Sequence, residues 1–304
     1  MDKKIFNFGC KKMIVIRLIL SILIFLPFFS CTKKEEKIKS GKPTVLVSVS
    51  PYAYFVQKIA EDTVDIETLV PAGNNPHIYE ATPKEVRRHQ NAAVWIYLGE
   101  SFDKKVLQFF QNTKREILVV DITQGIDLLS NSEEEESGHC CHHHDEGKDL
   151  HVWLSPTLAK IQAQKIAAAL TSLLPHQQMR FQANLEVFLN ELDDLDKQIT
   201  NLLEPIKGKA ILVSHPAFGY FCHDYHLTQL SIETEGKDPL PQHITEILAK
   251  AKSYAIQSVL TQPQYSNKGA ELLAHTLDLP THQVDPYAEN YSENLLAIAK
   301  VIAK

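Results

Sequence analysis

The sequence predicts an α/β protein of two lobes, each a (β/α)4-type unit with a mostly parallel sheet, joined by one long rigid helix. Short β-branched runs alternate with helical patterns from residue 44 onward, which is typical of βα units. These runs fall into two sets of four, separated by a stretch of unbroken helical periodicity. A chain of 304 residues with 44% hydrophobic content is long enough for two lobes with a cleft between them.

The predicted strands are short runs rich in Val, Ile, Leu and Thr, and they define the lobes. We expect the N-terminal lobe to span residues 43–175 and the C-terminal lobe residues 205–304. In the N-terminal lobe the strands are expected at 44–50, 65–70, 93–98 and 117–122. In the C-terminal lobe they are expected at 210–214, 228–232, 258–261 and 283–284.

A helical pattern without Gly or Pro predicts a linker helix over residues 176–204. Its apolar residues recur at intervals of three and four, so one stripe of the helix is expected to be buried. These residues are Phe181, Leu185, Phe188, Leu189, Leu192, Leu195, Ile199 and Leu202. At a rise of ~1.5 Å per residue the helix is ~40 Å long and can pass both lobes. Such a stiff connector is expected to limit hinge motion.

Residues 1–30 have the parts of an export signal: a lysine-bearing start, an apolar run from Leu18 to Phe29, and Ser30 before Cys31. The run is shorter than the ~20 residues that a membrane-spanning helix needs. The segment ending at Cys31 resembles a bacterial lipobox, whose cysteine becomes the lipidated first residue. Phe28 departs from the usual aliphatic residue, which leaves a plain secretory signal as the alternative. Residues 31–42 are expected to form the lipidated cysteine and a polar tether.

Charge and cysteine content exclude some classes of protein. The formal net charge is -6 although the signal segment is basic, so the remainder is more acidic still and nucleic acid is not an expected partner. Of the five cysteines, Cys10 lies in the signal and Cys31 is the expected lipid site. The remaining Cys140, Cys141 and Cys222 have no regular spacing, so the fold is expected to depend on its core and not on disulfides.

Four potential metal ligands follow predicted strands or precede helices: His77, His151, His215 and Asp285. In parallel α/β sheets the carboxyl ends of the strands line the ligand crevice, so these positions from two lobes can converge there. Three neutral imidazoles and one carboxylate suit a divalent ion such as zinc. Spacing alone leaves open that each histidine is a surface or structural residue.

Several motifs occur in one order along the chain and together resemble the cluster A-I metal-binding proteins of ABC importers, the group of zinc- and manganese-binding lipoproteins. The motifs are Ser48-Val-Ser-Pro-Tyr52, Val70-Pro-Ala-Gly-Asn-Asn-Pro-His-Ile-Tyr-Glu80, Asp149-Leu-His-Val-Trp-Leu-Ser-Pro156, Val213-Ser-His-Pro-Ala-Phe-Gly-Tyr220, Ser231-Ile-Glu233 and Val284-Asp-Pro286. The resemblance covers essentially the whole mature chain. One departure is Gln262-Pro-Gln264, where the family commonly has Glu-Pro-Gln; because it lies outside the four expected ligands, we expect little effect.

The resemblance implies a protein without enzymatic activity that captures a metal ion outside the cytoplasmic membrane. Its partners would be an ABC permease with a cytoplasmic ATPase and, through the lipid anchor, a membrane; the protein itself is expected to be a monomer. The four ligand positions of the family fall on His77, His151, His215 and Asp285, in the cleft between the lobes. Histidine at 215, where manganese-associated relatives often have glutamate, favours Zn²⁺, with Mn²⁺ or Fe²⁺ as the alternative.

Residues 131–149 form a charged, low-complexity stretch that is expected to be a surface loop. By resemblance to the His-rich and acidic loops of zinc-type relatives, it is a candidate accessory metal site that would collect ions near the cleft. The alternative is a solvated loop that binds metal only adventitiously. The residues concerned are His139, Cys140, Cys141, His142, His143 and His144.

Two other functions are alternatives to metal import. A metalloenzyme would use the histidines with Asp285 as a base, but the sequence has neither a His-Glu-x-x-His motif nor a Gly-x-Ser-x-Gly elbow. A surface adhesin or structural lipoprotein is the second alternative. It predicts binding to extracellular matrix that does not depend on His77.

Overall fold

The computed structural model describes residues 41–112, 116–130, 147–233 and 241–304. The expected signal, Cys31 and residues 131–146 with the accessory metal residues lie outside this part of the chain. Within it, no helix is both long enough and apolar enough to cross a membrane.

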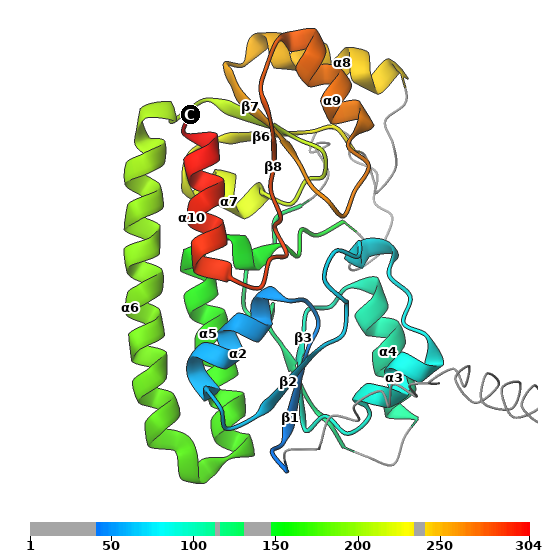
Figure 1. Ribbon diagram of the computed structural model, residues 1–304, viewed down its shortest axis with the longest axis vertical. Helices are drawn as coiled ribbons and strands as arrows, with labels where there is room; N and C mark the ends of the chain where they lie inside the picture. The colour runs from blue at the N-terminus through cyan, green and yellow to red at the C-terminus, as the bar shows by residue number, and fades with distance from the viewer. Residues whose placement is uncertain (1–40, 113–115, 131–146, 234–240) are drawn as a thin grey trace, which may run out of the picture. The chain divides into compact units, whose positions relative to one another are not determined.

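Two four-stranded parallel sheets form the two lobes (Figure 1). The first sheet has the order β2-β1-β3-β4 and contains β1 (Thr44–Val47), β2 (Asp65–Thr68), β3 (Val94–Tyr97) and β4 (Leu118–Asp121). The second sheet has the order β6-β5-β7-β8 and contains β5 (Ala210–Val213), β6 (Thr228–Ser231), β7 (Ile256–Thr261) and β8 (Thr281–Gln283). The predicted two-lobed α/β fold is confirmed, and every predicted strand is present. β7 and β8 each begin two residues earlier than expected.

The helices connect the parallel strands and cover the sheets. In the first lobe they are α2 (Pro51–Ala60), α3 (Pro83–His89), α4 (Ser101–Gln111) and α5 (Pro156–Leu173). In the second lobe they are α7 (Gly219–Asp224), α8 (Pro241–Ser253), α9 (Lys268–Leu277) and α10 (Tyr291–Ile302). In the sequence, the predicted long helix α6 (Gln178–Leu203) connects the two lobes, and a 3-10 turn precedes it and another follows it.

Helix α6 contacts helices from both ends of the chain. It packs against α5 and α2 of the first lobe and against α10 of the second (Figure 1). Its buried stripe is the predicted one except at two positions, since Leu189 and Leu202 are only partly buried and Leu203 is buried instead. One helix is therefore part of the core of both lobes.

The strand β5 shows how the second sheet is covered on both faces. Ile211 and Val213 point into the main core, which continues through both lobes to α10. Ala210 and Leu212 point to the other face, into a smaller core beneath α8 and α9. This alternation follows from the two-residue period of a strand. The main core also contains Trp95 and Trp153.

We expect Phe188→Ala on α6 to lower the free energy of unfolding by about 3–5 kcal/mol. The Phe188 side chain is 1% exposed and packs edge-on against Phe55 at 5.2 Å and Tyr54 at 5.9 Å, so its loss leaves a cavity between α6 and α2. Urea unfolding measures the change. The neighbouring Val187→Ala, at a position that is 68% exposed, is the control and should stay within about 0.5 kcal/mol of the original protein. Equal effects of the two substitutions would contradict this packing.

Candidate metal centre

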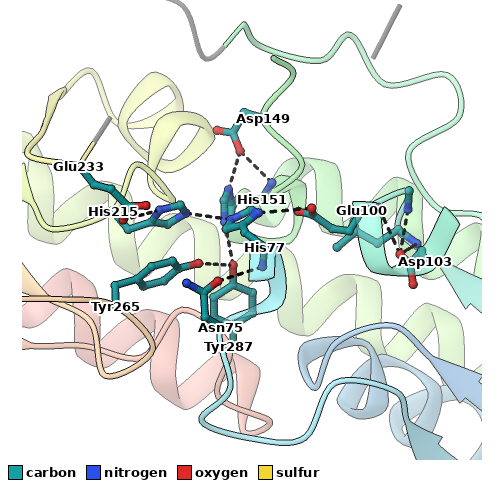
Figure 2. Close-up of polar contacts among 12 residues, drawn as sticks. Asn75, His77, Glu100, Asp103, Asp149, His151, His215, Glu233, Tyr265 and Tyr287 are labelled. Atoms are coloured by element: carbon teal, nitrogen blue, oxygen red, sulfur yellow. Dashed lines mark hydrogen bonds and ion pairs between the residues drawn. The ribbon is translucent and has the colours of Figure 1, made fainter. Parts of the chain in front are cut away.

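Three of the four expected ligands meet at one point. The ligand atoms of His77, His151 and His215 all lie within 4.8 Å of one another, the one such cluster of potential metal ligands among the described residues. Nε2 of His77 lies 3.1 Å from Nε2 of His215. Figure 2 shows the three rings converging from different segments of the chain. Residues far apart in the sequence thus form one group of nitrogen donors.

Each histidine is held by local structure at the end of a strand or the start of a helix. His77 lies in a 3-10 turn (Pro76–Ile78) after β2, where its backbone N–H donates to Oδ1 of Asn75. His151 comes directly before the 3-10 turn (Val152–Leu154) that leads into α5. His215 follows β5 and contributes the potential ligand nitrogen of the second lobe. The carboxyl ends of β2 and β5 therefore deliver ligands to one place, as the parallel topology requires.

Gln262 fixes the backbone at His215. Its Oε1 accepts a hydrogen bond of 2.7 Å from the backbone N–H of His215 and one of 2.9 Å from the hydroxyl of Ser214. An amide oxygen and a carboxylate oxygen can both accept these bonds. The glutamine at this position therefore supports the ligand loop without adding a negative charge beside it.

A carboxylate faces the Nδ1 atom of every histidine in the cluster. Oδ1 of Asp149 lies 2.7 Å from Nδ1 of His151, and Oε2 of Glu233 lies 3.1 Å from Nδ1 of His215. Oε2 of Glu100 lies 3.3 Å from Nδ1 of His77. Ionised carboxylates only accept hydrogen bonds, so they fix the proton of each neutral ring on Nδ1. Each Nε2 is then left with a lone pair, the form in which imidazole binds a metal ion.

The short distance between His77 and His215 favours a positive charge between the rings when both carry their proton on Nδ1. If both rings carry their proton on Nδ1, two lone pairs face each other across 3.1 Å and repel. Either a proton on one ring or a cation shared by both relieves this repulsion. Two nitrogens bound to one tetrahedral zinc ion at ~2.0 Å lie roughly 3.3 Å apart, close to the separation observed. The geometry therefore suits a shared metal ion.

The pKa values of these two rings move in opposite directions. Burial alone would lower the pKa of His77, but the hydrogen bond and charge of Glu100, with the charges of Glu233 and Asp149, outweigh it and raise the pKa. Burial lowers the pKa of His215 well below its usual range, and the neighbouring His151 and His77 lower it further. Of the two rings, His77 is therefore the one that holds a proton more readily.

Two features hold the carboxylates in place. The turn that presents Glu100 is anchored by Asp103, whose Oδ2 accepts the backbone N–H groups of residues 98, 99 and 100, and Gly99 adopts a φ of +97° there (Figure 2). Asp149 lies against Gly219, where an added Cβ would come within 2.6 Å of its Oδ2. The first residue of α7 must therefore lack a side chain for Asp149 to reach His151.

Asp285, the fourth expected ligand, is near the site but outside the cluster of three. Its Oδ1 accepts hydrogen bonds from Nε2 of Gln264 at 2.7 Å and from the backbone N–H of Tyr287 at 2.9 Å. These two bonds hold the carboxylate at the start of the segment after β8. The structure thus brings the three histidines together and places Asp285 beside them without contact.

Two tyrosines complete the site, and the sequence analysis did not identify them. The ring of Tyr265 stacks on His215 with a centroid distance of 3.9 Å and an interplanar angle of 5°. The hydroxyl of Tyr287 lies 2.9 Å from Nε2 of His151 and 3.0 Å from the hydroxyl of Tyr265. Burial raises the pKa of both phenols, so both keep their protons at neutral pH. The Asp-Pro-Tyr sequence after β8 offered only the proximity of Tyr287 to Asp285 as a signal.

Two other residues, His89 and Cys222, have structural roles. His89 is buried and its Nδ1 lies 2.6 Å from Oε2 of Glu67, so it is an ordinary partnered histidine. Cys222 is a buried free thiol on α7, and burial raises its pKa. Neither contributes an atom to the histidine cluster.

A family of known proteins has the same sequence pattern. The family model for the periplasmic component A of the zinc-uptake complex, ZnuA, matches residues 45–304. The chain belongs to this family. The match covers both lobes and all the candidate ligands, so the predicted resemblance to metal-binding components of ABC importers is confirmed.

Individual ZnuA-type relatives are similar over most of their length. A protein of Chlamydia trachomatis serovar D, whose name mentions metal binding but no particular metal, is 30% identical over 94% of this chain and 99% of its own. The high-affinity zinc uptake system protein ZnuA of Bacillus subtilis is 31% identical over 83% of this chain and 81% of its own. A crystal structure of a ZnuA deletion mutant with zinc bound has a TM-score of 0.76 and 33% identity, covering 86% of this chain and 97% of that one.

Membership in the ZnuA family places the chain among extracytoplasmic metal-binding components of transport systems, which are not a family of enzymes. Such a component acts with membrane proteins that carry the metal onward. The arrangement of three imidazoles backed by three carboxylates gives this chain the donor set that such a role needs.

We expect Asp149→Asn to weaken zinc binding by roughly 10- to 100-fold, the usual effect of changing a residue that orients a metal-binding histidine. The amide keeps the shape of the carboxylate but loses the charge that supports His151. Competition with a chelating dye measures the dissociation constant. Asp193→Asn on α6, which removes a surface ion pair with Lys160, is the matched control and should leave zinc binding unchanged. Equal affinity of the two variants would contradict the assigned role of Asp149.

Proposed function

We propose that this protein captures Zn²⁺ outside the cytoplasmic membrane with high affinity and delivers it to an ABC permease driven by a cytoplasmic ATPase. The observation that carries the proposal is the convergence of three Nε2 atoms, each on a ring whose Nδ1 faces a buried or half-buried carboxylate. This arrangement orients neutral imidazoles and makes them better donors. The sequence similarity to the zinc uptake protein of Bacillus subtilis supports the same metal.

The proposed ligands are His77, His151, His215 and Asp285. Three imidazoles favour zinc, whereas a harder oxygen-rich set suits manganese. Asp285 would become the fourth ligand by turning its carboxylate toward the cluster, a movement that its contacts with Gln264 and the Tyr287 backbone must allow. A shell closed by four protein ligands leaves no position for a substrate water, so the proposed protein binds and releases its cargo without catalysing a reaction.

The remaining parts of the proposal concern the chain around the site. A lipid on Cys31 would anchor a monomer to the outer face of a bacterial membrane after removal of residues 1–30, with 31–42 as the tether. The lobes would be 43–175 and 205–304, joined by 176–204. The loop from His139 to His144 would collect ions for the main site. Mn²⁺ is the alternative cargo, and the histidine at position 215 argues against it.

We expect the metal-free protein to take up one zinc ion per chain and to bind it more tightly than manganese. His215→Ala should weaken zinc binding by more than roughly 100-fold, beyond the effect of losing an orienting partner, because a donor atom is removed. Competitive titration with both metals, followed by elemental analysis, measures stoichiometry and preference. His275→Ala, an exposed histidine on α9, serves as the control. Tighter binding of manganese than of zinc would refute the metal assignment, and no stoichiometric metal would refute the function.

We expect zinc affinity to fall as the pH drops, beginning above the usual pKa of histidine. The pKa of His77 is raised, so its proton competes with the metal up to a higher pH than an ordinary histidine would allow. Glu100→Gln removes the main cause of this raised pKa. In that variant the pH at which affinity falls should therefore be lower than in the original protein. At high pH the variant should bind zinc more weakly than the original protein does. Zinc titrations across a pH series, with the exposed Glu271→Gln as control, test this; an unshifted profile would contradict it.

A further inference from the structure

The hydroxyl of Tyr287 forms a hydrogen bond with Nε2 of His151, the atom that would bind a metal ion. Asp149 accepts two bonds through Oδ1, from the backbone N–H of His151 and from its Nδ1. Nε2 of His151 therefore carries a lone pair and no proton. The hydroxyl of Tyr287, 2.9 Å away, must be the donor of this hydrogen bond. It follows that the hydroxyl of Tyr265 donates to that of Tyr287, giving a chain of bonds that ends on Nε2.

One lone pair cannot accept a hydrogen bond and bind a metal ion at the same time. We propose that Tyr287 is an affinity-determining residue that competes with the metal ion for Nε2 of His151. The inference deepens the proposed function and rests on it. Zinc binding at His151 must replace the Tyr287 hydrogen bond, and zinc release restores it. The cost of breaking that bond is subtracted from the affinity for zinc, which eases transfer of the ion to the permease.

The packing of Tyr287 keeps this competition in place. The side chain is 7% exposed, its ring packs against Trp153 with a centroid distance of 5.3 Å, and its backbone N–H is bound by Asp285. The hydroxyl is therefore held inside the buried site, between His151 and Tyr265. His151, itself 3% exposed, is fixed by Asp149, so neither partner can move far from the other.

The contact with Asp285 links this competition to the fourth proposed ligand. Oδ1 of Asp285 accepts the backbone N–H of Tyr287, so rotation of the carboxylate toward the histidines releases the residue whose hydroxyl covers His151. The fourth proposed ligand and the competing hydroxyl are therefore linked through one backbone hydrogen bond.

Tyr287→Phe should tighten zinc binding by about 2- to 10-fold, the effect of one net hydrogen bond. The substitution keeps the ring and leaves Nε2 of His151 without a donor in the metal-free protein, which destabilises that form alone. The rise in melting temperature on adding zinc should therefore be larger for Tyr287→Phe than for the original protein. Zinc dissociation, followed by transfer to a fluorescent chelator, should be slower by a similar factor.

Two controls separate competition from a general effect of losing a phenol hydroxyl. Tyr54→Phe removes a hydroxyl that donates to Glu191 on α6 and touches none of the three histidines, and it should leave zinc affinity unchanged. Tyr265→Phe removes the donor behind Tyr287 and should tighten zinc binding less than Tyr287→Phe does. In the original protein, zinc should also perturb the tyrosine ultraviolet absorption, and Tyr287→Phe should reduce this signal; the part that remains comes from Tyr265, which stacks on His215.

Weaker or unchanged zinc binding by Tyr287→Phe would overturn the inference, because a hydroxyl that acts as a ligand or a spacer gives those results. A zinc-dependent tyrosine absorption change of the same size in Tyr287→Phe as in the original protein would overturn it as well. Failure of the original protein to bind zinc would instead refute the proposed function. The two failures are therefore distinguishable in one set of titrations.

Discussion

The hydrogen bonds between three carboxylates and the Nδ1 atoms of three histidines are the constraint on which the metal centre depends. They fix the proton of each ring on the outer nitrogen, so that the inner nitrogens of His77, His151 and His215 present lone pairs to a common point. Rings so arranged repel one another unless a cation lies among them. The fold keeps the rings in this arrangement by burying the carboxylates and anchoring the turns that carry them. A divalent cation relieves the repulsion between the rings.

The architecture of the lobes makes this geometry possible without a dedicated metal-binding motif. Parallel sheets deliver the segments after β2 and β5 to facing edges, and α6 belongs to the cores of both lobes, so these edges keep their separation. Each ligand comes from a turn that is fixed by nearby side chains, as Gln262 fixes the backbone of His215. The centre is therefore assembled from contacts that are distant in sequence and rigid in space.

Much of the fold could be predicted because it follows from local patterns. The alternation of apolar strands with helical periodicity is visible in the sequence, and so is the buried stripe of α6. The three histidines could be proposed from their places after strands and from the family motifs. Tyr287 could not, because its significance arises from a hydrogen bond across the lobes to His151, which no spacing encodes. Asp285 shows the converse limit: the motif identifies the residue, but only coordinates reveal that Gln264 holds it away from the cluster.

Because Gly219 approaches Asp149 closely, the residues allowed at these two distant positions depend on each other. Any residue with a Cβ at 219 collides with the carboxylate that orients His151, and Asp149 cannot retreat without releasing that ring. Even a chemically conservative substitution at position 219 would therefore damage the metal site. Random mutagenesis of the chain should identify substitutions of this glycine that abolish metal uptake although no ligand has changed. Only a second substitution that returns the Asp149 carboxylate to His151 should restore uptake.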